Sequence, residues 1–161
     1  MKLKIASEND AIAKVRRQPG ELDVVSIRDP GHAIDFRDEC QDLLVLEFHD
    51  ACHDNGRFRA DVTVPSRKHV SEAIEWCRER ESVLFHCAGG VSRSSALAVV
   101  VACANGMPAA EAFSTVLNPM LHFPNPIIIG LGAEILGMPE IVEEAKKFEE
   151  SAVRVFSDPE D

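Results

Sequence analysis

The sequence predicts an α/β fold with a central, mostly parallel sheet of about four strands flanked by helices. Short apolar runs alternate with helix-like segments in the first half of the chain, and helix-like segments dominate the second half. The run at 43–48 is almost continuously apolar, as in a strand that is covered on both faces. With 161 residues, the chain fits one domain, expected at 1–156 and followed by an acidic tail at 157–161.

In the first half, strands are expected at 1–6, 22–27 and 43–48, each ending near polar or turn residues. A helix at about 7–17 begins at the capping-box sequence SEND and stops before Pro19-Gly20. A polar loop follows from residue 50 to about 65. Because it is long for a compact domain, we expect it to have a functional role.

In the second half, a helix at 66–81 is predicted by apolar residues at i, i+3, i+4 and i+7, and a strand at 82–85 by the next apolar run. Four further helices are delimited by glycine and proline, at about 93–105, 108–117, 126–137 and 139–156. In parallel sheets, ligands bind at the carboxyl ends of strands. The loop after the strand at 82–85 therefore becomes the first candidate site.

The charge of the chain excludes some partners. It carries 27 acidic and 17 basic residues, a net charge of −10. This argues against nucleic acid and anionic membranes, because binding either requires clustered lysine and arginine. The longest apolar run, at 96–104, is shorter than the ~20 residues of a membrane-spanning helix, and we see no signal peptide. Five cysteines without a CxxC pair or zinc-type spacing indicate reduced thiols, a cytoplasmic location and no metal or other cofactor.

The stretch HCAGGVSRSSA at 86–96 joins the strand at 82–85 to the following helix. Its small residues allow the backbone N–H groups of Ala88, Gly89, Gly90, Val91 and Ser92 to point inward as an anion-binding nest, beside a helix N-terminus.

Two chemically active side chains, Cys87 and Arg93, flank the five residues of the nest. The positive potential of the nest favours the nucleophilic thiolate of Cys87. Arg93 carries a planar guanidinium that can hold two phosphate oxygens. The stretch therefore contains the groups needed for attack on phosphorus.

The pattern His86-Cys87-x-x-Gly90-x-x-Arg93-Ser94 resembles the HCxxGxxR(S/T) signature of the protein tyrosine phosphatase superfamily. The resemblance covers roughly 22–137 and is greatest to small dual-specificity-like phosphatases of bacteria and phages. It implies a phosphatase fold of the phosphotyrosine protein phosphatase II type and a phosphocysteine intermediate on Cys87. Gly89 departs from the pattern, since relatives more often have alanine there.

The resemblance also implies roles for the flanking residues. Ser94 would hydrogen-bond the thiolate, or alternatively cap the helix. His86 would orient the loop through hydrogen bonds, or simply be a core histidine. Asn125 would help to close the pocket, although an N-cap ahead of Pro126 is the more ordinary use of Asn-Pro.

A general acid must protonate the leaving oxygen. Relatives use an aspartate in the loop after the preceding strand, and Asp50 matches best. Asp54, Asp61, His49 and His53 in the same loop could also donate the proton. A disulfide between Cys52, also in this loop, and Cys87 is a further possibility.

The expected substrate is a single phosphate on a modest-sized group, either in a phosphorylated peptide or in a small phosphomonoester. The loop carries no lysine that would serve several phosphates. Phosphate, vanadate and sulfate are expected to inhibit. Two other functions remain open: a phosphate-binding domain without turnover, and a sulfur-transfer or arsenate-reductase-like cysteine enzyme.

Overall fold

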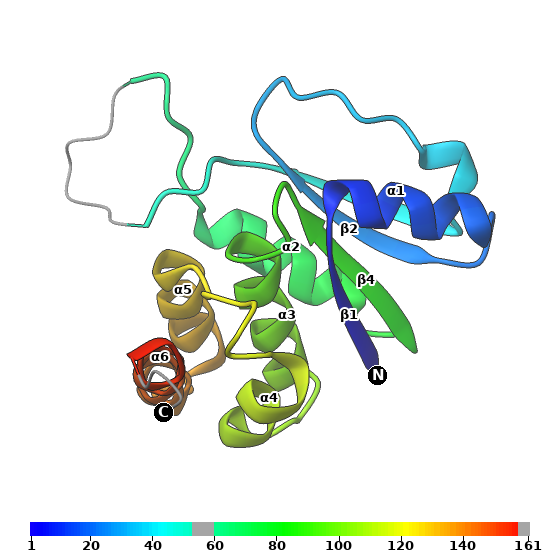
Figure 1. Ribbon diagram of the computed structural model, residues 1–161. Helices are drawn as coiled ribbons and strands as arrows, with labels where there is room; N and C mark the ends of the chain where they lie inside the picture. The colour runs from blue at the N-terminus through cyan, green and yellow to red at the C-terminus, as the bar shows by residue number, and fades with distance from the viewer. Residues whose placement is uncertain (53–59, 158–161) are drawn as a thin grey trace.

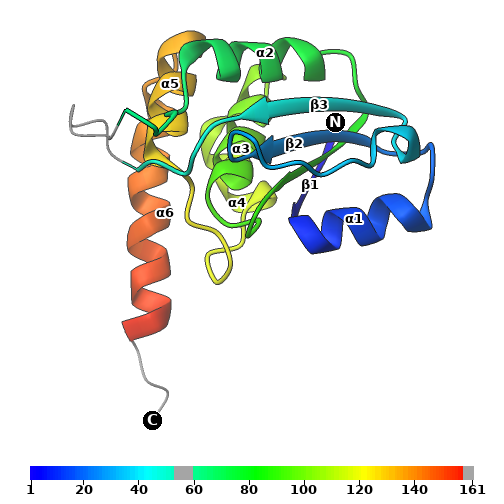
Figure 2. The ribbon, with the colours of Figure 1, turned by 90° about the horizontal axis from the view of Figure 1, so that it is seen from above.

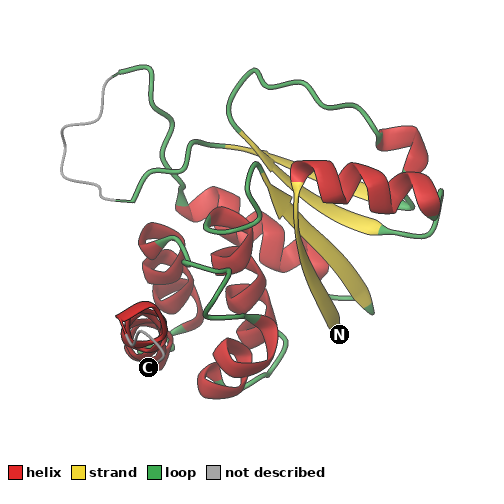
Figure 3. Ribbon diagram, in the orientation of Figure 1, coloured by secondary structure: helices red, strands yellow, loops and turns green. Residues whose placement is uncertain are grey.

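The computed structural model describes residues 1–52 and 60–157 of the chain. Its centre is a four-stranded parallel sheet of order β1-β4-β2-β3 (Figures 1 and 3). The strands are β1 (Lys2–Ser7), β2 (Asp23–Arg28), β3 (Asp42–Glu47) and β4 (Ser82–Cys87). The helices are α1 (Glu8–Arg17), η1 (Arg37–Glu39, a 3-10 turn), α2 (Arg67–Cys77), α3 (Arg93–Ala104), α4 (Ala109–Val116), α5 (Pro126–Leu136) and α6 (Glu140–Ser157). The α/β fold predicted from the sequence is confirmed.

Helices cover both faces of the sheet. Figure 2 shows α1 on one face and α2 and α3 on the other, while α4, α5 and α6 form a further layer. Side chains of β4 alternate between the two faces, because successive residues of a strand point in opposite directions. Leu84 packs into the core under α1, whereas Phe85 and Cys87 pack into the larger core that includes α3.

Helix α3 is enclosed on all sides. Every residue from Arg93 to Cys103 is buried, because the sheet lies on one side of the helix and α2, α4 and α5 pack around the others. Close packing requires Gly132 of α5, where an added Cβ would collide with Val100 of α3. Gly130 has open space at the same position, so only one of the two glycines has this role. The buried α3 fixes the end of the loop that precedes it.

Several element boundaries differ from the prediction. Strand β4 continues through His86 to Cys87, so that the thiol lies at its last position. Helix α2 ends at Cys77, short of the predicted residue 81, and the next residues form a turn that Arg80 fixes. The Arg80 guanidinium lies over the Trp76 ring and pairs with Asp23. The turn η1 was not predicted. No helix within the described ranges is long and apolar enough to span a membrane.

Candidate active site

The loop at 88–92 passes directly against the end of β1. Gly90 has a φ of +68°, and a Cβ added there would lie 2.5 Å from the backbone carbon of Ala6 and 2.6 Å from the nitrogen of Ser7. Only glycine fits both the backbone angle and the space. A Cβ at Gly89, in contrast, would meet only Val91, at an ordinary 3.6 Å. The departure from the family pattern at Gly89 is therefore sterically neutral.

Three carbonyl groups of the loop are bonded to neighbouring segments. Ala88 O accepts a hydrogen bond from the N–H of Glu8 (3.2 Å), at the start of α1. Val91 O accepts one from Phe123 (3.0 Å), and Ser92 O one from Asn125 (3.1 Å). Two neighbouring segments, the start of α1 and the stretch before α5, thus hold the loop from outside.

The N–H groups of residues 89–93 are left without acceptors. None of them donates a hydrogen bond to another residue of the described chain. Unpaired backbone N–H groups beside a helix N-terminus form a concave site for an anion. This arrangement is compatible with the nest that the small residues of the loop predict, which stays a prediction.

Cys87 lies at the base of this loop. Its side chain is buried, and its Sγ lies 3.1 Å from Oγ of Ser94 in the first turn of α3. Ser94 does not cap the helix: the N-cap position belongs to Ser92, which makes no side-chain capping bond. The capping role considered for Ser94 is therefore wrong, and its hydroxyl is available to the sulfur.

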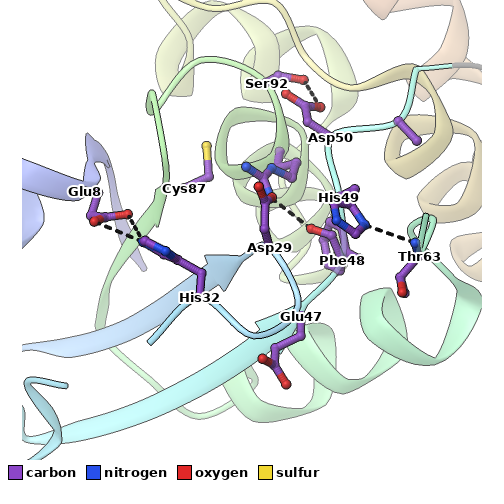
Figure 4. Close-up of polar contacts among 12 residues, drawn as sticks. Glu8, Asp29, His32, Glu47, Phe48, His49, Asp50, Thr63, Cys87 and Ser92 are labelled. Atoms are coloured by element: carbon purple, nitrogen blue, oxygen red, sulfur yellow. Dashed lines mark hydrogen bonds and ion pairs between the residues drawn. The ribbon is translucent and has the colours of Figure 1, made fainter. Parts of the chain in front are cut away.

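Arg93 is buried, and one corner of its guanidinium is fixed. Its Nη1 donates to Oδ1 of Asp29 (2.7 Å) and to the carbonyl oxygen of Phe48 (2.8 Å). Its buried Nε has no partner among the described residues. Figure 4 shows Asp29 and Phe48 beside Cys87. The two acceptors hold the cation next to the nest and leave a donor for a ligand.

Asp29 is a site residue that the sequence alone did not reveal, because there it stands only as part of the turn Asp29-Pro30-Gly31. A usable signal was present, because Asp29 directly follows β2 (Asp23–Arg28) and so lies at the same sheet edge as the loop. The carbonyl of Phe48, one residue after β3, has no comparable signal in the sequence.

Asp50 contacts the loop directly. Its Oδ1 accepts hydrogen bonds from Oγ of Ser92 (2.8 Å) and Nδ2 of Asn125 (2.9 Å), while the residue as a whole stays exposed (Figure 4). These two contacts place the carboxyl group beside the nest, where a leaving oxygen would be protonated.

Among the other candidate acids of the segment at 49–61, the structure describes His49 and Asp61. His49 uses its Nδ1 to accept a hydrogen bond from the N–H of Thr63. Asp61 is exposed. Asp54 and His53 lie outside the described residues. Asp50 is therefore the candidate acid that the described structure brings to the loop.

Asn125 combines the two roles considered for it. Its Oδ1 caps α5 by accepting from the N–H groups of Ile127 (3.0 Å) and Ile128 (3.2 Å). Its Nδ2 donates to Asp50 and to the carbonyl oxygen of Ala51 (2.9 Å). The residue is fully buried, so the cap also positions the loop that carries Asp50.

His86 lies at the end of β4, directly before Cys87. It faces the α1 side of the sheet, opposite to Cys87, with its ring centroid 5.6 Å from that of Phe36. Both ring nitrogens are buried and lack hydrogen-bond partners in the described part of the chain. Burial lowers the pKa of His86 to about 4, and the positive charge of Arg28 contributes to the same shift. A contact between the ring and the backbone of Cys87, at the base of the loop, opposes this shift. The orienting role of His86 stays a prediction.

The four cysteines other than Cys87 lie in different surroundings. All five are free thiols. Burial raises the pKa of Cys40 to about 11, of Cys77 to about 12 and of Cys103 to about 11. Cys52 is exposed, and its pKa is raised by burial of the sulfur and by the negative charge of Asp50.

Comparisons with known proteins bear on the fold. No protein-family model and no curated protein sequence matches the chain. Among solved structures, DUSP15 is similar with a TM-score of 0.57 and 19% identity, over 92% of this chain and 90% of that one. Tk-PTP in its active form gives a TM-score of 0.40 and 17% identity, over 94% and 90% of the two chains. The likeness to DUSP15 shows that the two chains share a fold.

Proposed function

We propose that the protein is a cysteine-dependent phosphomonoester hydrolase of the protein tyrosine phosphatase type. The observation that carries this proposal is the loop after β4. Its Ala88, Val91 and Ser92 carbonyls are bonded outward, the N–H groups of residues 89–93 have no acceptor among the described residues, and the buried Cys87 lies at its base. The shared fold with DUSP15 and the resemblance of the HCxxGxxRS pattern support it.

In the first step, the thiolate of Cys87 attacks phosphorus. The S–P bond forms as the P–O bond to the leaving group breaks, and Asp50 gives its proton to the departing oxygen. The loop N–H groups and Arg93 hold the phosphoryl oxygens and stabilise the charge that spreads over them in the transition state.

In the second step, water attacks the phosphocysteine and Asp50 takes up the proton of that water. The S–P bond breaks and inorganic phosphate leaves. The hydroxyl of Ser94, 3.1 Å from the sulfur, stabilises the departing thiolate. The nest and Arg93 supply all the positive charge that these steps require.

The substrate is a phosphorylated peptide or a small phosphomonoester carrying one phosphate, and phosphate, vanadate and sulfate compete with it. The acidic net charge speaks against nucleic acid as a partner. The need for an unoxidised thiolate at Cys87 fits a cytoplasmic location, where thiols stay reduced.

Phosphate release from p-nitrophenyl phosphate and from phenyl phosphate, between pH 5 and 7 without added metal, tests the proposal. Cys87→Ser should abolish release, whereas Cys52→Ser, a matched change at an exposed thiol, should not. Asp50→Asn should slow phenyl phosphate about 100-fold or more and p-nitrophenyl phosphate much less, since nitrophenolate leaves without a proton.

Two results would contradict the proposal. If the wild type releases no phosphate and yet binds vanadate, the protein is a phosphate-binding domain. If Asp54→Asn, and not Asp50→Asn, shows the dependence on the leaving group, the assignment of the acid is wrong.

A further inference from the structure

A small pocket opens beside the nest, on the side of α1 and of the loop after β2. Its volume is about 210 Å³, and its lining includes Glu8, Arg28, Asp29, His32, Ala88 and Arg93. At roughly 30 Å³ per water molecule, this space holds a small polar group such as a carboxylate and no bulky one. Figure 4 shows the Glu8–His32 pair on one side of Cys87 and the Ser92–Asp50 pair on the other. A group in this pocket would therefore lie next to a bound phosphate and leave Asp50 in place.

Two arginines of the pocket each carry a buried donor without a partner. Nε of Arg93 and Nη2 of Arg28 are both buried, and neither has a hydrogen-bond partner within residues 1–52 and 60–157. A buried guanidinium N–H without an acceptor is costly, so each donor is expected to be satisfied when a ligand binds. On the proposed function, the acceptor for Arg93 is a phosphoryl oxygen. The donor of Arg28 then remains for a second group of the ligand.

The carboxylates of the pocket are already paired. Both oxygens of Glu8 contact Nε2 of His32, at 3.1 and 3.3 Å. Asp29 accepts a hydrogen bond from Nη1 of Arg93 at 2.7 Å. In the described lining of the pocket, the groups that still need a partner are therefore donors.

The positive charge of Arg28 is compensated only in part. Its Nε donates to Oγ of Ser26 (2.7 Å), and its guanidinium lies 5.7 Å from the centre of the Phe36 ring. Neither contact supplies a full negative charge. Burial lowers the pKa of Arg28 and outweighs the opposing charges of the nearby carboxylates Asp35, Glu47 and Glu8. An anion in the pocket would stabilise the charged guanidinium.

We infer that this pocket binds a carboxylate of the substrate through Arg28, next to the phosphate that the nest and Arg93 hold. The inference rests on the proposed function and narrows its substrate class to phosphomonoesters with a carboxylate near the phosphate. A carboxylate fits better than a second phosphate, because the negative charges of Glu8 and Asp29 repel a dianion more strongly than a monoanion. The carboxylate can come from an acidic residue beside a phosphorylated residue, or from a small phosphomonoester that carries its own.

The test measures binding to Cys87→Ser, which removes the nucleophile and leaves the nest in place. Dissociation constants are compared for O-phosphoserine against O-phosphoethanolamine, which lacks only the carboxylate, and for phosphotyrosine peptides flanked by glutamate against the same peptides with glutamine. We expect about tenfold tighter binding of the carboxylate member in at least one pair, since hydrogen bonds between charged groups are the stronger ones. The pair that shows the ratio identifies the source of the carboxylate.

Arg28→Gln, added to Cys87→Ser, should lower this ratio to about twofold or less, because it removes the charge that pairs with the carboxylate. Arg28→Lys keeps the charge but not the Nη2 donor, and should retain part of the ratio. Arg78→Gln removes an exposed arginine that directly follows α2 and serves as the matched control, with the ratio unchanged. Urea denaturation checks that each variant is folded.

Ratios near one in both pairs would overturn the inference, and so would a ratio that Arg28→Gln leaves unchanged. Equal weakening of both members of a pair by Arg28→Gln would also overturn it, since Arg28 would then act on the phosphate itself. The proposed reaction is judged separately, by release of phosphate from p-nitrophenyl phosphate by the wild type. Release without the preference removes only the inference, and a preference without release removes only the reaction.

Discussion

At the scale of single residues, the site depends on one glycine that cannot be replaced. Gly90 combines a φ of +68° with a position at which an added Cβ would collide with the backbone of Ala6 and Ser7. Gly89, its neighbour, has neither constraint. The two positions therefore form a matched pair for mutagenesis.

Gly90→Ala should reduce kcat/KM more than 100-fold and lower the free energy of unfolding by about 1–3 kcal/mol, the usual cost of a strained backbone conformation. Gly89→Ala should change kcat/KM by less than about twofold and the free energy of unfolding by less than about 0.5 kcal/mol. Phosphatase kinetics and urea denaturation check the pair. Equal losses in the two variants would show that the close approach to β1 has no effect.

His86 gives the protein a predictable dependence on pH. Burial lowers its pKa to about 4 from the 6.5 of an exposed histidine. The unfolded chain therefore binds the proton more tightly, and the stability that the neutral ring contributes is complete above pH 6.5 and is lost as the pH falls toward 4. Lowering the pH through this range reduces the free energy of unfolding by about 3 kcal/mol through His86.

The measurement is the imidazole NMR signal of His86, which should show no titration between pH 7 and 5. Urea denaturation of wild type and His86→Gln over the same range gives the energetic counterpart, since the variant should lose less stability as the pH falls. A ring that titrates near pH 6.5 would refute the buried, neutral state.

Local spacing alone led to Cys87, Arg93 and the nest between them as candidates. The side of the sheet that His86 faces was not predictable in this way, because the direction of its side chain depends on how far β4 extends. Asp29 was hidden for a related reason: its partner Arg93 lies 64 positions along the chain, and only the strand order brings the two together.

At the scale of elements, the site is assembled where the ends of strands meet the beginnings of helices. Asn125 shows this best, because one amide caps α5 and also holds Asp50 against the loop. The sequence Pro124-Asn125-Pro126 predicted the cap. The contact with Asp50 needs the packing of α5 on α3, which no local pattern encodes.

Asn125→Ala should lower the free energy of unfolding by about 1–3 kcal/mol, since it removes an N-cap and leaves buried groups unpaired. It should also reduce kcat on phenyl phosphate more than on p-nitrophenyl phosphate, because Asp50 loses its anchor. Ser66→Ala removes the side-chain cap of α2, away from the site, and is the matched control. If both variants lose stability and both keep full activity, Asn125 is only a cap.

At the scale of the whole molecule, the parallel sheet explains why distant segments converge on one edge. The loops after β2 and β3 contribute Asp29 and Asp50, and the last position of β4 contributes Cys87. The fold class followed from the alternation of strands and helices. The strand order β1-β4-β2-β3 did not follow from the sequence, since short apolar runs carry no information about which strands are neighbours.

The fold also places the five thiols in different surroundings. Cys40, Cys77 and Cys103 are buried without an anion nest, and burial raises the pKa of each. Cys87 is buried to a similar extent but stands at the nest and beside Ser94. Cys87 must therefore differ in reactivity from thiols that are equally shielded from water.

The rate of alkylation of each cysteine by iodoacetamide at pH 6, with and without inorganic phosphate, tests this claim most directly. We expect Cys87 to react much faster than Cys40, Cys77 and Cys103, and phosphate or vanadate to protect it. Similar rates at all five cysteines, or a fast reaction at Cys87 that phosphate does not slow, would contradict the anion nest and the function built on it.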